Sequence, residues 1–281
     1  MNQRILHLVS TRLFTTLQPE HDEKWLESRL LIFKTFTLPS FINQSSQDFQ
    51  WILLVSAELP AGVLDKLRGL IKDYPNFHII EVTVADLHDQ PEYTVAFNQF
   101  ISDYQLDYDF LLHSRIDGDD AWNSAYVGTI RQTAQTWVAK YSAWQNYSGL
   151  IFNFPYGQVC YPFPIRNKHG IGRWKRKFFS QSVDVLTIKG KLDTFYKFPH
   201  SKTRIFAKQN NFRCIYLKSR QPMWLYVQHV QNDGLLRKWH RWFLLFEKLW
   251  MPFHKFCGND LCRYGITDKL LNDFNQEYNR G

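Results

Sequence analysis

The stretch Phe110-Leu-Leu-His-Ser-Arg-Ile-Asp-Gly-Asp-Asp-Ala121 carries the most information about the fold. Its first residues continue a short apolar run that starts at Tyr108, and such a run is typical of a strand buried in a sheet. It ends in three carboxylates, those of Asp117, Asp119 and Asp120. Carboxylates this close repel one another, and a hard divalent cation with oxygen ligands relieves the repulsion. The stretch therefore predicts a strand that ends in a site for Mg²⁺ or Mn²⁺, and a solvated acidic turn is the alternative.

Before this stretch, short continuous apolar runs alternate with segments in which the apolar residues have helical spacing. We expect strands at 5–9, 49–55, 77–82 and 108–113, separated by helices at 22–36, 60–73 and 92–105. This alternation predicts an α/β fold with a mostly parallel sheet. In such sheets ligands bind beyond the carboxyl ends of the strands. The loops expected at 10–16 and 114–120 would therefore lie at the binding edge.

The pattern changes after residue 120. We expect a helix at 122–139, a hairpin at 149–163 with a Tyr-Gly turn, and a basic loop at 164–179. Further strands are expected at 181–188, 212–217 and 223–228, and a short polar helix from about 266. The segment 235–250 predicts an amphipathic helix whose composition suits either a membrane interface or packing on the core.

Charge is distributed unevenly along the 281 residues, whose net charge is +8. Residues 1–120 carry −9, residues 121–183 carry +8 with no carboxylate, and residues 184–281 carry +9. The basic segment at 166–177 would neutralise a diphosphate, bind an anionic acceptor, or form a solvated face. We find no nucleic-acid recognition motif and therefore expect no nucleic-acid partner.

Two sequence features bear on the compartment. No apolar run reaches the roughly 18 residues that span a membrane, and the start does not read as a signal peptide. The four Cys residues do not form a disulfide framework. We therefore expect a cytoplasmic protein, with peripheral contact to the inner membrane face if the helix at 235–250 lies in the interface.

Two classes of enzyme place a D-x-D motif after a strand. Phosphatases that form an aspartyl phosphate use the first Asp as nucleophile, on their first strand. Glycosyltransferases of the GT-A fold carry the motif after about the fourth strand of a Rossmann-like half. Because Asp117 follows the fourth expected strand, the second class fits better.

The chain resembles a bacterial family of rhamnosyl transferases that is similar to GT-A transferases of the family 2 kind. The string Arg115-Ile-Asp-Gly-Asp-Asp-Ala121 is the most specific match. The other matching residues, which span about 220 positions with it, are Thr11 to Phe14, Trp25, Leu26, Arg29, Phe33, Leu38 to Ser40, Gln44, Phe49, Trp51, Trp224, His229 and Asn232.

The resemblance implies donor contacts at the strand ends. Thr11 and Arg12 would contact the nucleotide. Arg115 would pair with a donor phosphate, or alternatively with its own Asp cluster. The second strand lacks an expected Asp and is followed by Ser56-Ala57-Glu58. Glu58 would then take over recognition of the base or ribose.

The resemblance also implies a metal site. Asp117 would contact the ribose or the sugar, and Asp119 and Asp120 would hold Mn²⁺ or Mg²⁺ against the donor diphosphate. Some GT-A enzymes complete the metal shell with a late His, a role that would fall to His229; a satisfied buried His is the alternative.

Inverting transfer also requires a general base that deprotonates the acceptor hydroxyl. Asp184 is the first carboxylate after Asp120 and is the leading candidate, with Asp193 next. A purely structural Asp is the alternative at this position.

We expect a GT-A glycosyltransferase with a donor half at 1–120, an acceptor half at 121–225 and a C-terminal helical extension at 226–281. It would move a sugar from a nucleotide-sugar donor to a hydroxyl of a surface glycan or a lipid-linked acceptor. The alternative from another class is a non-catalytic basic protein that binds polyanions or membranes.

Overall fold

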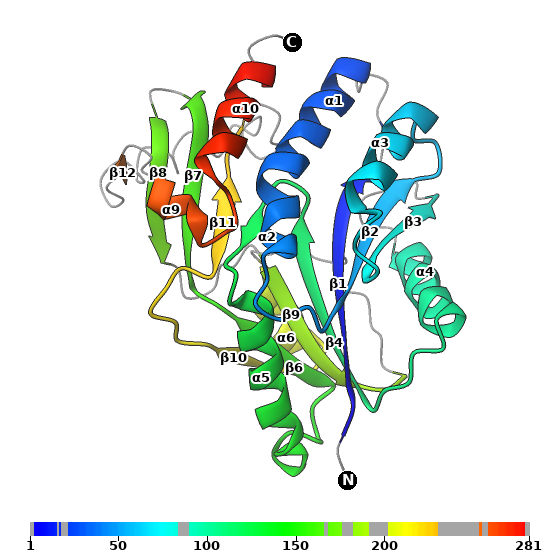
Figure 1. Ribbon diagram of the computed structural model, residues 1–281. Helices are drawn as coiled ribbons and strands as arrows, with labels where there is room; N and C mark the ends of the chain where they lie inside the picture. Colours follow the sequence, from blue (N-terminus) through cyan, green and yellow to red (C-terminus); the bar gives the residue numbers. More distant parts are fainter. Residues whose placement is uncertain are drawn as a thin grey trace.

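A central sheet of seven strands forms the middle layer of the computed structural model (Figure 1), which describes residues 3–15, 17, 22–83, 90–165, 168–175, 182–190, 202–229, 253–254 and 258–278. The strand order is β10-β6-β9-β4-β1-β2-β3, and only β9 runs antiparallel to its neighbours. The strands are β1 (Ile5–Phe14), β2 (Gln50–Ser56), β3 (Phe77–Val82), β4 (Phe110–Asp117), β6 (Gly149–Asn153), β9 (Ser182–Ile188) and β10 (Phe212–Tyr216). The predicted α/β fold with a mostly parallel sheet is confirmed, and the three carboxylates from Asp117 to Asp120 lie at the end of the fourth strand.

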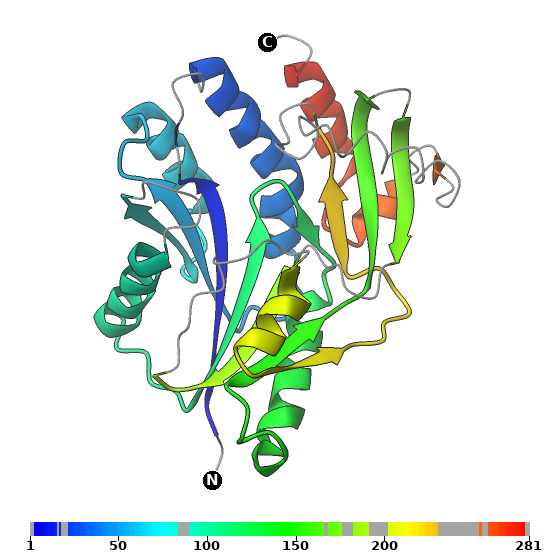
Figure 2. The ribbon, with the colours of Figure 1, turned by 180° about the vertical axis from the view of Figure 1, so that it is seen from behind.

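Helices cover both faces of this sheet because its strands are apolar on both sides. Val9, Trp51 and Leu112 pack with α1, α2, α3 and α5, whereas Leu8 and Leu111 pack with α4. Figure 2 shows α6 on the face opposite α5. The helices are α1 (Glu23–Ile32), the π-helical turn η1 (Phe33–Thr37), α2 (Leu38–Ile42), α3 (Ala61–Ile71), α4 (Gln90–Asp103), α5 (Tyr126–Val138), the short 3₁₀ turn η2 (Tyr141–Ala143), α6 (Thr203–Gln209), α9 (Gly258–Cys262) and α10 (Asp268–Tyr278).

A second sheet of five strands stands beside the carboxyl end of β4 (Figures 1 and 2). Its order is β12-β8-β7-β11-β5. The strands are β5 (Ala121–Trp122), β7 (Tyr156–Ile165), β8 (Lys168–Lys175), β11 (Trp224–Val227) and β12 (Phe253–His254). Because β5 follows the D-x-D turn directly, the carboxylates lie where the two sheets meet.

Two of our expectations for the middle of the chain were wrong. The hairpin expected at 149–163 does not form, because β6 joins the central sheet and β7 joins the second one. Pro155 separates them, and Tyr156 and Gly157 begin β7 instead of forming a turn. The basic loop expected at 164–179 contains strand β8, which pairs antiparallel with β7. Its two glycines and four basic residues, His169 included, predict a loop by composition, but the ladder with β7 makes the segment a strand.

The central sheet contains strands from both halves that we expected on either side of residue 120. β1 to β4 come from the first half, and β6, β9 and β10 from the second. The helix expected near the end of the chain is present as α10, which packs on α1. Within the described ranges, no helix has the length and apolar character needed to cross a membrane.

Candidate functional site

The turn after β4 is held tightly between β1 and the π-helical turn. The backbone N–H of Asp120 donates to the carbonyl of Asp117 at 3.2 Å, and the Thr37 hydroxyl donates to the carbonyl of Gly118 at 2.9 Å. A Cβ added at Gly118 would lie 2.7 Å from Leu13 Cδ1 and 3.3 Å from the carbonyl oxygen of Arg12, so a larger residue here would require the Leu13 side chain on β1 to shift. The turn therefore presents its carboxylates from a fixed backbone.

Asp119 is the centre of a buried group of three side chains. Its Oδ2 lies 2.9 Å from His229 Nε2 and 3.0 Å from a terminal nitrogen of Arg29. That Arg29 nitrogen is also 3.0 Å from His229 Nε2. The side chains of Arg29, Asp119 and His229 are 15%, 9% and 0% exposed. The structure thus brings together Asp119 and His229, as expected, and adds Arg29 from α1.

The number of protons available to Arg29, Asp119 and His229 limits the hydrogen bonds that these three side chains can form together. If Arg29 donates to His229 Nε2, that nitrogen carries a lone pair and cannot donate to Asp119. Asp119 Oδ2 and His229 Nε2 are then two electron-pair donors 2.9 Å apart. If Nε2 instead carries the proton, its N–H faces an N–H of Arg29. In the first arrangement the second hydrogen of the same Arg29 nitrogen can be donated to Asp119 Oδ2, so the guanidinium supplies the cation that the two atoms share.

Charges around Asp119 set its protonation state. Burial raises the pKa of this carboxyl, but the positive charge of Arg29 and the contact with His229 outweigh burial and hold the pKa below its ordinary value. Asp119 is therefore ionised at neutral pH and is available as an anionic ligand.

Asp120 has a different environment. Its Oδ1 accepts the backbone N–H of Val227 at 3.0 Å, which fastens β11 to the turn. Its Oδ2 is buried and has no hydrogen-bond partner among the described residues. Burial, with the charges of Asp119 and Asp117, raises the pKa of Asp120 well above its ordinary value. The expected role of Asp120 as a metal ligand stays a prediction, because its Oδ2 is free but the described residues include no group of three metal ligands.

The donor atoms fit a divalent ion that has few protein ligands. In the described part of the chain, no group of three or more His, Cys, Asp or Glu side chains is placed to hold a metal ion. Asp119 and His229 supply two atoms 2.9 Å apart, about the 3 Å that separates neighbouring octahedral ligands of an ion bound at about 2.1 Å. Mg²⁺ commonly uses one or two carboxylates and completes its shell with water and substrate phosphates. The site therefore suits an ion that shares its shell with a phosphate.

The first strand is longer than expected. Residues 10–14 continue β1 instead of forming a loop, because they pair with β2 and with β4 as far as Asp117. Thr11 faces the core, where its hydroxyl accepts the indole N–H of Trp51 at 3.0 Å. The expected contact of Thr11 with a nucleotide does not fit this buried hydroxyl.

Arg12 and Asp117 lie side by side at the carboxyl ends of their strands. They are register partners in β1 and β4, so their side chains leave the sheet on the same face. Arg12 and Asp117 are partly buried, and Arg115, which is fully buried, shares this face two residues before Asp117. Glu58 lies in an exposed turn after β2. The roles expected for these four residues stay predictions.

Asp184 is buried inside the central sheet. It faces Ser114 across the β4–β9 ladder, and its Oδ2 accepts the hydroxyl of Tyr126 on α5 at 2.5 Å. The side chain is 0% exposed. A general base must touch the acceptor hydroxyl, so the expected role of Asp184 as base does not fit this position. It belongs to a structural network of buried hydroxyls.

Replacement of Asp184 by Asn should remove the free-energy cost of keeping an ionised carboxylate buried at neutral pH. Burial raises the pKa of Asp184 to about 6, against hydrogen bonds from Ser114, Tyr126 and Ser182. Its stabilising contribution is therefore present at low pH and lost as pH rises through about 6. Between pH 5 and pH 8 the free energy of unfolding should shift by about 1–2 kcal/mol in favour of the variant.

Urea unfolding of both proteins at several pH values measures this shift. Tyr126→Phe, which removes the hydrogen bond and keeps the ring, serves as the matched variant and should raise the pKa of Asp184 further. Parallel pH profiles for Asp184→Asn and the unchanged protein would contradict the assignment.

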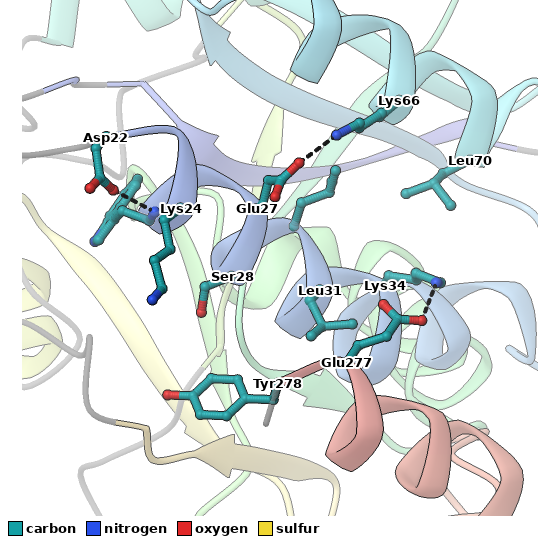
Figure 3. Close-up of a pocket in the computed structure, with 12 residues that line it drawn as sticks. Asp22, Lys24, Glu27, Ser28, Leu31, Lys34, Lys66, Leu70, Glu277 and Tyr278 are labelled. Atoms are coloured by element: carbon teal, nitrogen blue, oxygen red, sulfur yellow. Dashed lines mark hydrogen bonds and ion pairs between the residues drawn. The ribbon is translucent and has the colours of Figure 1, made fainter. Parts of the chain in front are cut away.

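A cavity of about 820 Å³ lies on α1 outside this group of side chains. Figure 3 shows α1, α3 and α10 lining it, with Leu31 and Leu70 inside. Two of its lysines are paired, Lys66 with Glu27 at 2.6 Å and Lys34 with Glu277 at 3.4 Å. None of its lining residues belongs to the carboxylate turn, so we do not assign the donor to it.

Sequence reasoning missed two neighbours of the turn. Arg29 was matched within the family pattern but given no role; its four-residue spacing from Trp25 was the available signal, because both then share one helix face. Tyr226 on β11 is the second. Burial, then the charges of Asp120 and Asp119, raise the pKa of its phenol well above the ordinary value.

Some predictions lie outside the described residues. These are Asn232, Asp193, the basic residues Arg166, Arg176 and Lys177, and the amphipathic helix at 235–250. The division of the chain into donor, acceptor and C-terminal parts also stays a prediction.

Comparison with known proteins gives one family and a set of similar structures. The family described as "Putative rhamnosyl transferase" matches residues 16–238. The structure of S. aureus TarS 1–349 in complex with UDP-GlcNAc is similar with a TM-score of 0.45 and 11% identity, covering 83% of this chain and 61% of that one. For S. aureus TarS the values are 0.41 and 12%, with 87% and 43% covered.

A third similar structure is a "putative nucleotide-diphospho-sugar transferase" from Desulfovibrio desulfuricans G20. Its TM-score is 0.39 and its identity 8%, with 86% of this chain and 95% of that one covered. The chain thus spans about three fifths of the length of TarS 1–349. No curated protein matches the chain.

Proposed function

This chain belongs to the rhamnosyl transferase family, a family of glycosyltransferases, and from this premise we propose that it is a metal-dependent transferase. It moves a sugar, rhamnose by the family description, from a nucleotide-sugar donor to a hydroxyl group. The acceptor is a surface glycan or a lipid-linked sugar. The observation that carries the proposal is the buried contact of Asp119 with His229 at the carboxyl end of β4.

Residues of the turn, together with His229, would bind the donor through a metal ion. Asp119 and His229 would hold Mn²⁺ or Mg²⁺, and Asp120 would offer one further oxygen. When bound there, the ion stabilises the negative charge that develops on the departing diphosphate. The proposal therefore places the diphosphate beside the turn.

Arg12 and Asp117 act on the donor from the adjacent strand ends. A guanidinium pairs with phosphate oxygens through two parallel N–H donors, which is the role that we give to Arg12. The carboxylate of Asp117 accepts a hydrogen bond from a hydroxyl of the ribose or sugar. Arg115, two residues earlier on the same face, adds positive charge beneath the phosphates.

Inverting transfer is part of the proposal, and it requires a base within reach of the acceptor. Because Asp184 is buried against α5, we do not give it this role. Asp193 is the next carboxylate along the chain. Peripheral contact with the inner membrane face is proposed for the helix expected at 235–250, which would bring a lipid-linked acceptor close.

A panel of UDP-, GDP- and dTDP-sugars, each with Mn²⁺, Mg²⁺ or EDTA, tests the function. We expect at least one donor to release its nucleoside diphosphate in a metal-dependent reaction. A protein that only binds polyanions or membranes would turn over none of them. A phosphatase would instead hydrolyse a generic phosphate ester and lose that activity with Asp117→Asn.

A further inference from the structure

Helix α1 holds Arg29 firmly in place. Asp22 caps the helix by accepting the backbone N–H of Trp25 at 2.8 Å. Trp25, one turn before Arg29, lies under the guanidinium with 5.8 Å between its ring centre and Arg29 Cζ, and it packs edge-on against Phe14 of β1. A stacked arginine of this kind is oriented as well as charged.

The guanidinium binds the atoms that a metal ion would use. One terminal nitrogen of Arg29 is 3.0 Å from Asp119 Oδ2 and 3.0 Å from His229 Nε2. Those two atoms are the ligand pair described above. A lone pair that a guanidinium N–H occupies is not available to an ion, and two cations repel each other at this separation. Arg29 and a divalent ion therefore exclude each other from the pair.

We propose that Arg29 is a competing counter-ion that keeps the metal position filled until the donor arrives. The inference rests on the proposed function, because it takes Asp119 and His229 as the metal ligands. Without the donor, the guanidinium neutralises Asp119. A donor diphosphate offers the guanidinium a new anionic partner, so the ion enters as Arg29 turns to the phosphates. Ion and donor then bind together, and the ion alone binds weakly.

The affinity of the protein for Mn²⁺ alone tests this inference without an activity assay. The free Mn²⁺ signal in electron paramagnetic resonance gives the dissociation constant for the unchanged protein and for Arg29→Gln. We expect Arg29→Gln to bind Mn²⁺ at least about fivefold more tightly, within the usual range of coupling between two ligands. Arg68→Gln is the matched control, because Arg68 is exposed on α3 and pairs with Asp65 and Glu81.

A double variant identifies where the ion binds. Adding Asp119→Asn to Arg29→Gln should abolish the gain. Unchanged, weaker or absent Mn²⁺ binding by a folded Arg29→Gln protein would overturn the inference. If Arg29→Gln does not fold, Arg29→Lys takes its place, with an affinity expected between the two because an ammonium lacks the planar fork. The donor panel is scored separately: metal-dependent turnover with unchanged Mn²⁺ affinity would reject the role of Arg29 and leave the proposed function intact.

Discussion

Asp119→Asn is expected to lower nucleotide-sugar turnover by on the order of 10²- to 10³-fold, the usual loss when a group that stabilises transition-state charge is removed. The carboxylate is 9% exposed and lies 2.9 Å from His229 and 3.0 Å from Arg29. An amide keeps the size of the side chain and removes its negative charge. The ion would lose its anionic protein ligand, and Arg29 would lose its partner.

Steady-state assays with the best donor of the panel measure this effect. The matched control is Asp65→Asn, at a position on α3 whose side chain is 73% exposed, and we expect its turnover to be unchanged. Circular dichroism shows whether each variant is folded. Turnover by folded Asp119→Asn within a few fold of the unchanged protein would contradict the role given to this residue.

Gly157→Ala should be the most damaging single change to the second sheet. A Cβ at this position would lie 2.1 Å from Cδ2 of Trp224 and 2.2 Å from its Cε3, far inside contact distance. The Trp224 ring cannot move away easily. It is fully buried, and its indole N–H donates to the carbonyl of Phe154 at 2.8 Å. We expect the free energy of unfolding to fall by about 3 kcal/mol or more, at the upper end for overpacked cores.

Gly69→Ala is the matched control for this prediction. Gly69 is exposed in α3 and an added Cβ meets nothing within 4 Å, so alanine should stabilise the helix by about 0.5–1 kcal/mol. Chemical unfolding of the three proteins gives both values. The second sheet supplies Val227 and is followed by His229, so Gly157→Ala should also weaken Mn²⁺ binding. Equal stability of Gly157→Ala and the unchanged protein would contradict the packing.

The strands and helices of residues 1–120 could largely be predicted, because their local sequence patterns agree with the tertiary structure. The apolar run before Asp117 forms a buried strand, and the glycine between the first two carboxylates lies where an added Cβ would press on Leu13 of β1. The end of β1 could not be predicted in this way. Thr11 is polar by sequence, but Trp51, 40 residues away, donates a hydrogen bond to it inside the core.

The site was only partly predictable, for reasons of distance along the chain. The sequence identifies Asp119, but Arg29 lies 90 residues before it and His229 lies 110 residues after it. Only the packing of α1 and β11 against the turn brings them together. Asp184 shows the opposite case. The strand that contains Asp184 was expected. The environment of the Asp184 side chain depends on α5, because the Tyr126 hydroxyl on that helix donates a hydrogen bond to its carboxylate.

The central claim is that a divalent ion at Asp119 and His229 holds the diphosphate of a nucleotide-sugar. Calorimetric titration of UDP, GDP and dTDP into the protein, with and without Mn²⁺, tests it most directly. We predict that at least one of them binds with Mn²⁺ present, and that binding is lost in EDTA and in Asp119→Asn. Absence of binding by all three, or binding that neither Mn²⁺ nor Asp119→Asn affects, would contradict the claim.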